Sequence, residues 1–212
     1  MQLTGAQALL RCLRAEQVGW VFGIASGKLT PLLHALSQTP EVRFIGLRHE
    51  AAGAMMAAAM FAGTGRVAVA LGEMAPGGIN LASGAGVAFN NHSAALLITT
   101  NQHRTAAYPH RGMFMDMDTR AVFAPLTKWS AVVGDVRRIP ELLRTAFRQA
   151  LGGRPGPVHL DIPQDVLAER CEFADDEFDL EPARYRNIAG PRPAAHRGDR
   201  CRCTVAPRRS GR

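Results

Sequence analysis

Short apolar runs alternate with helical patterns along most of the chain. The runs are rich in β-branched and small apolar residues and are bounded by glycine, proline or polar residues, which is typical of buried strands. Between them, apolar residues recur at the three-to-four-residue spacing of helices that bury one face. The predicted strands lie within residues 20–24, 42–47, 66–72, 94–100, 124–133 and 153–163.

Two helices have clear boundary signals. Thr4 followed by Gln7 has the pattern of a capping box and predicts a first helix over residues 5–17. Residues 138–151 form an amphipathic pattern with Pro140 in the first turn, where proline is tolerated. The alternation of strands and helices predicts an α/β fold, a doubly wound, mostly parallel sheet of about six strands with helices on both faces.

The alternating pattern fades near the C-terminus. Residues 171–187 are predicted to form an acidic linker, and residues 192–212 have no apolar periodicity. The formal net charge of +7 also resides there, because residues 1–183 carry −1 and residues 184–212 carry +8. We therefore expect one domain over residues 1–183 and a basic, disordered tail over residues 184–212. The Arg, Pro, Ala and Gly composition of this tail also fits a frameshift product of GC-rich DNA.

The bulk properties exclude several functional classes. The tail has only Tyr185 for stacking on bases, so we do not expect it to bind nucleic acid. No apolar run approaches the ~20 residues of a membrane span, and the N-terminus lacks the apolar core of a secretory signal. A cytoplasmic location without membrane association is the expectation. The His and Cys residues do not fall at metal-ligand spacing, so no metal site is predicted.

The most unusual charged residues are Arg48, His49 and Glu50, which follow the strand at 42–47. In a doubly wound sheet, ligands bind at the carboxyl ends of the strands, where these residues lie. Glu50 also opens a helix, and an acid in a first turn stabilises a helix without any further role. The next turns are unusually small and apolar, however, and a carboxyl buried there favours its protonated form, as a catalytic acid or base requires. Spacing alone leaves both interpretations open.

Two glycine-bearing segments, 23–32 and 72–80, follow strands at the same end of the sheet. Glycine there would let the backbone approach a ligand closely. Neither segment is a G-x-G-x-x-G motif or a Walker P-loop, so these motifs do not support nucleotide binding.

Five blocks together resemble a known family. They are TGAQALLRCLRAEQVGWVFGIASG, LRHEAAGAMMAAAMFAGTGRVAVAL, APGGIN, PLTKW and GRPGPVHLDIPQDV. In this order and spacing, over residues 3–168, they resemble the N-terminal, pyrimidine-binding (PYR) domain of thiamine-diphosphate enzymes of the acetolactate synthase and pyruvate-oxidase-like family. The resemblance implies that Glu50 is the glutamate that hydrogen-bonds N1′ of the cofactor's aminopyrimidine. It also implies that the cofactor supports chemistry on 2-oxo acids.

The resemblance also suggests residues around Glu50. The family's G-x-P-G-G loop corresponds to Gly23–Gly27 and places Ala25 and Ser26 at the cofactor. Its T-S-G-P-G-x-T-N loop corresponds to residues 73–80. The remaining expected cofactor-binding residues are Pro76, Gly77 and Asn80.

Three further residues are candidates for the substrate side, namely His92, Gln102 and Met115. Met115 stands where acetolactate synthases usually carry Gln, and the segment around His92 is more similar to benzoylformate decarboxylase relatives. The resemblance therefore implies an acetolactate synthase-like domain. A benzoylformate-type decarboxylase domain and a non-catalytic partner or remnant subunit remain as alternatives.

Half of the family's cofactor site has no counterpart in this sequence. The family holds Mg²⁺ and the diphosphate with a G-D-G…N motif, but Gly134-Asp135 and Gly198-Asp199 do not continue into that motif. We therefore expect the chain to bind only the pyrimidine half of thiamine diphosphate and to be truncated and inactive alone. A homo-oligomer or a separate diphosphate-binding chain would have to complete the site.

Overall fold

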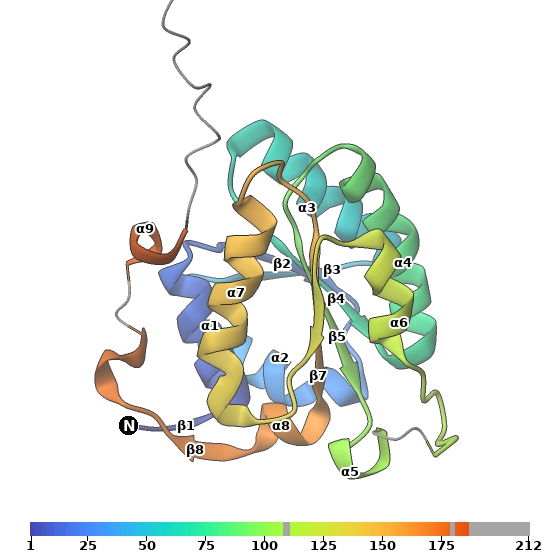
Figure 1. Ribbon diagram of the computed structural model, residues 1–212. Coiled ribbons are helices and arrows are strands. Elements are labelled where there is room, and N and C mark those ends of the chain that lie inside the picture. Colours follow the sequence, from blue (N-terminus) through green and yellow to red (C-terminus); the bar gives the residue numbers. More distant parts are fainter. Residues whose placement is uncertain (108–110, 179–180, 187–212) are drawn as a thin grey trace, which may run out of the picture.

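A six-stranded, fully parallel sheet forms the centre of the computed structural model, which describes residues 1–107, 111–178 and 181–186 (Figure 1). The strand order is β3-β2-β4-β5-β7-β6. Helices cover both faces, so the predicted doubly wound α/β fold is confirmed. The strands are β2 (Trp20–Gly23), β3 (Arg43–Gly46), β4 (Val69–Glu73), β5 (Leu96–Asn101), β6 (Ser130–Val132) and β7 (Val158–Pro163).

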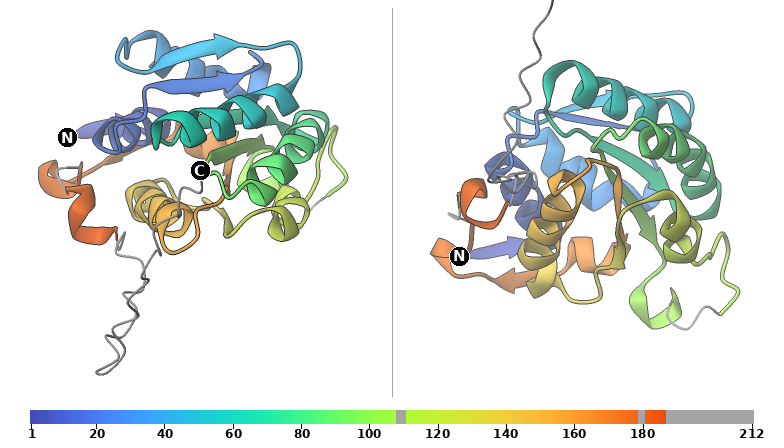
Figure 2. Two further views of the ribbon diagram at one scale, coloured as in Figure 1. Left: turned by 90° about the horizontal axis from the view of Figure 1, so that it is seen from above. Right: turned by 45° about the horizontal axis from the view of Figure 1, so that its top comes forward.

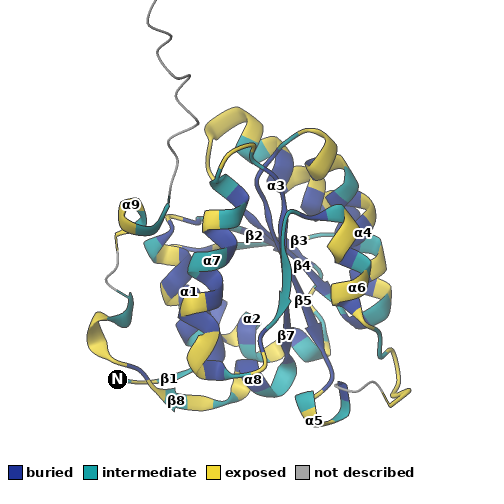
Figure 3. Cartoon of the chain, viewed as in Figure 1, coloured by how far each residue is buried: buried dark blue, intermediate teal, exposed yellow. Residues whose placement is uncertain are grey.

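The two faces of the sheet bury different kinds of side chain. On β4, Val69 and Leu71 point to a core shared with α1 (Gly5–Ala15), α2 (Thr30–Ser37) and α7 (Ile139–Leu151). Ala68 and Ala70 point to the opposite core, which α3 (Glu50–Thr64), α4 (Met74–Asn90) and α6 (Thr119–Phe123) cover. Figure 3 shows the resulting buried strands between helices whose outer surfaces are exposed. Small residues on the second face allow α3 and α4 to pack closely on the sheet.

Local capping defines where the helices begin and end. The capping box at α1 is confirmed, because Gln7 N donates to Thr4 Oγ1 and Thr4 N donates to Gln7 Oε1. Helix α3 is capped by His49, whose Nδ1 accepts a hydrogen bond from Ala51 N at 3.3 Å. It ends at Gly65 in the left-handed conformation that glycine adopts without steric cost. His49 therefore has a defined structural role.

The segment 72–80 differs from the predicted glycine-rich turn. Strand β4 ends at Glu73 and α4 begins at the next residue, Met74, whose φ is +50°. This abrupt connection requires close backbone contact, because a Cβ on Gly72 would lie 2.6 Å from Gly77 O. The glycines thus serve strand-to-helix packing and do not form a loop.

The predicted linker also contains regular structure. Strand β8 (Arg170–Glu172) pairs antiparallel with β1 (Gln2–Thr4), and Figure 2 shows the N-terminus beside this orange segment. Strands of three residues are too short to give a recognisable period in the sequence. The remaining elements are η1 (Gly27–Leu29), α5 (Arg104–Ala107), η2 (Ala124–Leu126), η3 (Val136–Arg138), α8 (Gln164–Ala168), η4 (Asp175–Phe178) and α9 (Pro182–Tyr185).

The last described residues contact the domain. Tyr185 Oη donates to Glu16 and the Arg186 guanidinium forms an ion pair with the same carboxylate. Most of the predicted tail, residues 187–212, lies outside the described residues. Within the described part of the chain, none of the helices has the length and apolar character needed to cross a membrane.

Candidate functional site

Glu50 lies at the carboxyl end of the sheet, as the first residue of α3, and only 9% of it is exposed. Its Oε2 accepts a hydrogen bond from Asn80 Nδ2 at 3.0 Å. Its Oε1 faces Gly77, where a Cβ would come within 3.1 Å of that oxygen. The structure therefore brings together three of the predicted residues, and a glycine leaves space beside the carboxyl oxygen that Asn80 does not bind. Pro76 is exposed one residue earlier, in the first turn of α4.

Close packing of α3 on α4 positions this pair. A Cβ on Gly84 would lie 2.4 Å from Ala51 O and 2.8 Å from Ala54 Cβ. Only glycine fits at that crossing, so the backbones approach more closely than larger residues would permit. Glu50 and Asn80 are each within four residues of this contact. The small residues after Glu50, which seemed an odd setting for a carboxyl, are what place it against α4.

The loop after β2 reaches the same end of the sheet. Ala25 is exposed, and Ser26 Oγ is buried without a hydrogen-bond partner among the described residues. The loop is attached to β4 by Glu73, whose Oε2 accepts from Lys28 N at 2.8 Å. Sequence reasoning missed Glu73, because it took this position only as a departure from the family loop. Its place directly after a buried strand was the signal that could have identified it.

Gln102 and Met115 lie after β5, and each makes a hydrogen bond that helps to position the backbone of a neighbouring segment. Gln102 is buried, and its Nε2 donates to Phe114 O at 2.9 Å. Met115 O accepts from Ala75 N at 3.1 Å, while the Met115 side chain stays exposed beside Met113 and Phe114. Gln102 therefore holds a loop in place, and Met115 lies next to the first turn of α4. The substrate roles expected for both residues remain predictions.

His92 lies away from the other candidates. It follows Asn90, the last residue of α4, and precedes β5, so it sits at the amino ends of the strands. Asn80 and Asn90 are ten residues apart in α4, a rise of about 15 Å, and this length of helix separates His92 from the turn that holds Asn80. Its neighbours include Phe89, Lys128 and Arg154. The structure thus does not bring His92 together with Glu50, because strand and helix run in opposite directions across the sheet.

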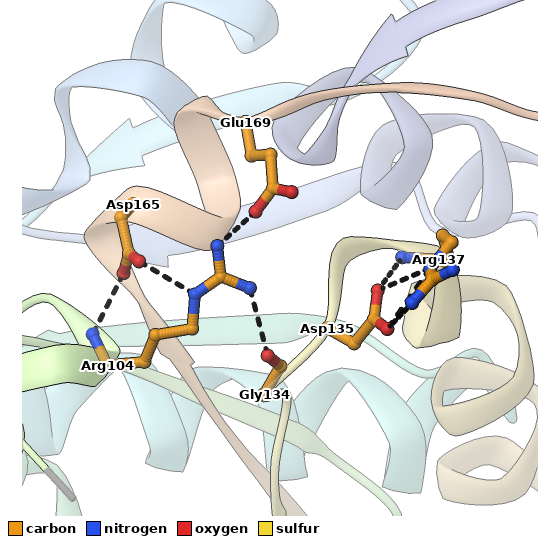
Figure 4. A network of polar contacts seen from close by, with 6 residues as sticks. All are labelled: Arg104, Gly134, Asp135, Arg137, Asp165 and Glu169. Atoms are coloured by element: carbon orange, nitrogen blue, oxygen red, sulfur yellow. Dashed lines mark hydrogen bonds and ion pairs between the residues drawn. The ribbon is translucent and has the colours of Figure 1, made fainter.

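A second polar group at the carboxyl ends ties together segments around β5 and β7. Arg104 Nε and N donate to the Asp165 carboxylate, Arg104 Nη1 donates to Gly134 O, and its Nη2 pairs with Glu169 (Figure 4). The guanidinium and the backbone N–H of Arg104 together satisfy these acceptors, which fits a structural clamp. The sequence did not single out Arg104, since its partners are about 30 and 60 residues distant.

The expected absence of a metal site can be compared only with the described residues. Among these, no three His, Cys, Asp or Glu side chains are placed to hold a metal ion. Asp135, from the Gly134-Asp135 pair, caps η3 and binds Arg137, whose guanidinium lowers the pKa of Asp135 to about 2 (Figure 4). Asp199 lies outside the described residues. Asp135 is therefore already engaged by a neighbouring guanidinium.

A family model and several known proteins match the chain. The family model described as thiamine pyrophosphate enzyme, N-terminal TPP binding domain, matches residues 3–122. The chain is 35% identical over 164 residues to a probable acetolactate synthase large subunit of Methanococcus aeolicus and 33% identical over 190 residues to the acetolactate synthase isozyme 1 large subunit of Escherichia coli K12. It is 34% identical over 191 residues to an acetolactate synthase large subunit of Corynebacterium glutamicum.

These alignments cover 77% to 90% of the chain but only 27% to 33% of the three relatives. The chain thus spans about a third of the length of the proteins that it matches. Residues 3–122 include Glu50, Gly77 and Asn80, so the family match and the clustered side chains concern the same part of the molecule. The chain belongs to the thiamine pyrophosphate enzymes, and its matching portion is their N-terminal TPP-binding domain.

Proposed function

We propose that this chain binds the aminopyrimidine half of thiamine diphosphate, with Glu50 as the carboxyl that holds and moves the proton at N1′. The observation that carries the proposal is the pairing of Glu50 with Asn80 beside Gly77. Asn80 occupies Oε2 and fixes the rotamer of the carboxyl. Oε1 remains available, and the missing side chain at Gly77 leaves room for a ring edge.

The surroundings of Glu50 support this role. The side chain is largely removed from water, and the facing helices contribute mainly Ala and Gly. A carboxyl held there is placed to hydrogen-bond a ring nitrogen. Thiamine diphosphate supplies, when bound, the carbon nucleophile for reactions of 2-oxo acids. The contribution of this chain would be to orient the pyrimidine and to control its proton.

The diphosphate and Mg²⁺ would be bound elsewhere. The described residues offer no acidic cluster for the metal, and the relatives are about three times as long as the chain. We therefore propose that the complete activity, an acetolactate synthase-like reaction of 2-oxo acids, requires a separate diphosphate-binding chain. The exposed side chains of Ile79, Met113 and Phe114 near the site offer apolar surface for such a partner. Alone, the chain would be inactive.

A benzoylformate-type decarboxylase is the second candidate. The observation that favours it is Met115, which is attached to α4 through its backbone and presents an apolar side chain to solvent near the cofactor-binding turn. An apolar residue in that place suits a 2-oxo acid with an apolar substituent better than a polar one does. Replacement of Met115 by Gln in an assembled enzyme would separate the two candidates by their substrate preference.

Titration with thiamine, which carries the pyrimidine but no diphosphate, tests the pyrimidine site directly. In amide NMR spectra, we expect millimolar thiamine to shift the signals of Glu50, Gly77 and Asn80. Glu50→Ala should lose these shifts, whereas Glu50→Gln should keep most of them, because its amide can still donate to N1′. Glu41→Ala is the matched control, since Glu41 is exposed and pairs with Arg14. Shifts that persist in Glu50→Ala would contradict the proposal.

Calorimetry with thiamine diphosphate and Mg²⁺ tests the need for a partner. We expect no tight binding to the chain alone, because the most strongly charged part of the cofactor finds no metal-bridged anchor. Tight binding by the isolated chain would show that it holds the diphosphate itself and would refute the incomplete-site proposal, while leaving the role of Glu50 intact.

A further inference from the structure

A buried polar network lies under the carboxyl ends of β5 and β7, on the face that α6 covers. Thr99 and Asp161 are fully buried, and Thr99 Oγ1 donates to Asp161 Oδ1 at 2.7 Å. Asn101 Nδ2 donates to Asp161 Oδ2 at 3.4 Å. A buried carboxylate costs free energy unless hydrogen bonds compensate for its lost hydration. Asp161 therefore organises the donors around it.

From Asn101 the network reaches a loop at the protein surface. Asn101 Nδ2 also donates to Met117 O at 2.9 Å, and Asn101 Oδ1 accepts from Gln102 N at 2.8 Å. Gln102 Nε2 in turn donates to Phe114 O at 2.9 Å. Two carbonyl groups of residues 113–117 are thus held from beneath. The side chain of Phe114 itself gives the loop little anchorage, since 77% of it is exposed.

The same loop packs against the first turns of α4. Met115 O accepts from Ala75 N at 3.1 Å. Gly78 faces the loop, since a Cβ there would lie 3.6 Å from Met117 Cε and 3.4 Å from Thr119 Cγ2, which is ordinary van der Waals contact. On the opposite side of these turns, Gly77 and Asn80 face Glu50. The first turns of α4 therefore lie between the loop and the carboxyl.

We propose that Asp161, acting through Asn101 and Gln102, is a positioning residue for the aminopyrimidine site. It fixes residues 113–117, and these fix the turns of α4 that hold Glu50. The inference rests on the proposed function for the identity of the ligand. Its effect on Glu50 passes through the loop and the helix.

Amide hydrogen exchange of the protein without any ligand tests this chain of contacts. Asp161→Asn removes one of the two acceptor oxygens at the start of the network. We expect the Ala75 and Gln102 amides, which donate into the network and the loop, to exchange about tenfold faster or more. The amides of Leu97 and Ile98 in the middle of β5 should change only as much as global stability changes. Equal acceleration at all four amides, or none at Ala75, would overturn the proposal.

Two further variants keep the test decisive. Ser130→Ala removes the contact of Ser130 Oγ with His159 Nδ1, which lies on the branch of the network away from the loop, and should leave Ala75 exchange unchanged. Gln102→Met removes only the donor to Phe114 O and should accelerate Ala75 exchange even if Asp161→Asn fails to fold. Because these experiments contain no cofactor, a negative result overturns the positioning role alone. Absent thiamine shifts in the unmodified chain would overturn the proposed function alone.

Discussion

At the scale of single residues, His159 shows how a polar side chain is kept neutral in the core. It is fully buried, its ring stacks on Phe123 at a centroid distance of 4.1 Å, and burial lowers its pKa to about 3. The single hydroxyl proton of Thr99 is donated to Asp161, so His159 Nε2 must carry the proton that it shares with Thr99 Oγ1. His159 Nδ1 then accepts from Ser130 Oγ at 2.8 Å.

This neutral histidine predicts an acid-sensitive fold. In the unfolded chain His159 is protonated below about pH 6.5, whereas in the folded chain it is protonated only below about pH 3. The free energy of unfolding therefore falls as the pH falls through this window. The loss from this group is about 1 kcal/mol per pH unit. Urea unfolding between pH 7 and pH 5 should show a shallower pH dependence in His159→Gln. The exposed His34→Gln serves as the control, and identical slopes in both variants would contradict the prediction.

At the scale of elements, the pair α3 and α4 is the framework of the candidate site. A Cβ on Gly84 would collide with the Ala51 carbonyl group, whereas a Cβ on Gly86 of the same helix would have no neighbour among the described residues within 4 Å and so has open space. The sequence indicated the helix that Glu50 opens, but it did not show which glycine lies at the crossing with the next helix. Glu50 and Asn80 approach each other only because the backbones do.

Replacement of these two glycines by alanine should have opposite effects. Gly84→Ala forces the helices apart and should lower the free energy of unfolding by about 1–3 kcal/mol. Gly86→Ala should be neutral or stabilise by up to about 1 kcal/mol, because alanine is the better helix former. Chemical denaturation of both variants gives the measurement. We also expect Gly84→Ala to weaken thiamine binding, since it displaces Asn80 from Glu50; equal stabilities would show that the crossing tolerates a methyl group.

At the scale of the whole molecule, the C-terminal segment closes the fold over α1 and α7. Phe173 N donates to Met1 O, and Arg144 Nη1 donates to Glu177 O. The last described residues of the segment, Tyr185 and Arg186, both bind Glu16, which is 7% exposed. The Arg186 guanidinium also lies 5.4 Å from the centre of the Phe147 ring. These contacts bring the last described residues onto the first helix.

Truncation tests the importance of this closure. A chain ending at Arg186 should unfold like the full chain. A chain ending at Ala183, the boundary expected from the sequence, should lose about 1–3 kcal/mol, because the buried Glu16 carboxylate then lacks its hydrogen-bond donor and its cation. Urea denaturation of the two truncated chains measures the difference. Equal stability would mean that Glu16 finds other partners or water when the segment is shortened.

The predictable and unpredictable parts of the fold differ in the range of the forces involved. Strands β4 and β5 and helix α7 could be predicted, since buried strands and amphipathic helices have periods that neighbouring residues define. The β1–β8 pair joins residues about 170 positions apart in strands of three residues. The connection from Glu73 to Met74 depends on contact between Gly72 and Gly77. Such features depend on contacts that no local window contains.

By itself, the sequence determined the α/β class, the carboxyl-end position of Glu50 and the resemblance to thiamine-diphosphate enzymes, because periodicity and short motifs are local properties. Only the tertiary structure decided which candidates share a site. It placed Asn80 and Gly77 beside Glu50. It also showed that Gln102 binds the loop at 113–117 and that His92 lies at the opposite end of α4. The reason is geometric. The 17-residue helix α4 spans the sheet, so residues at its two ends lie at opposite ends of the sheet even though both were candidates for one site.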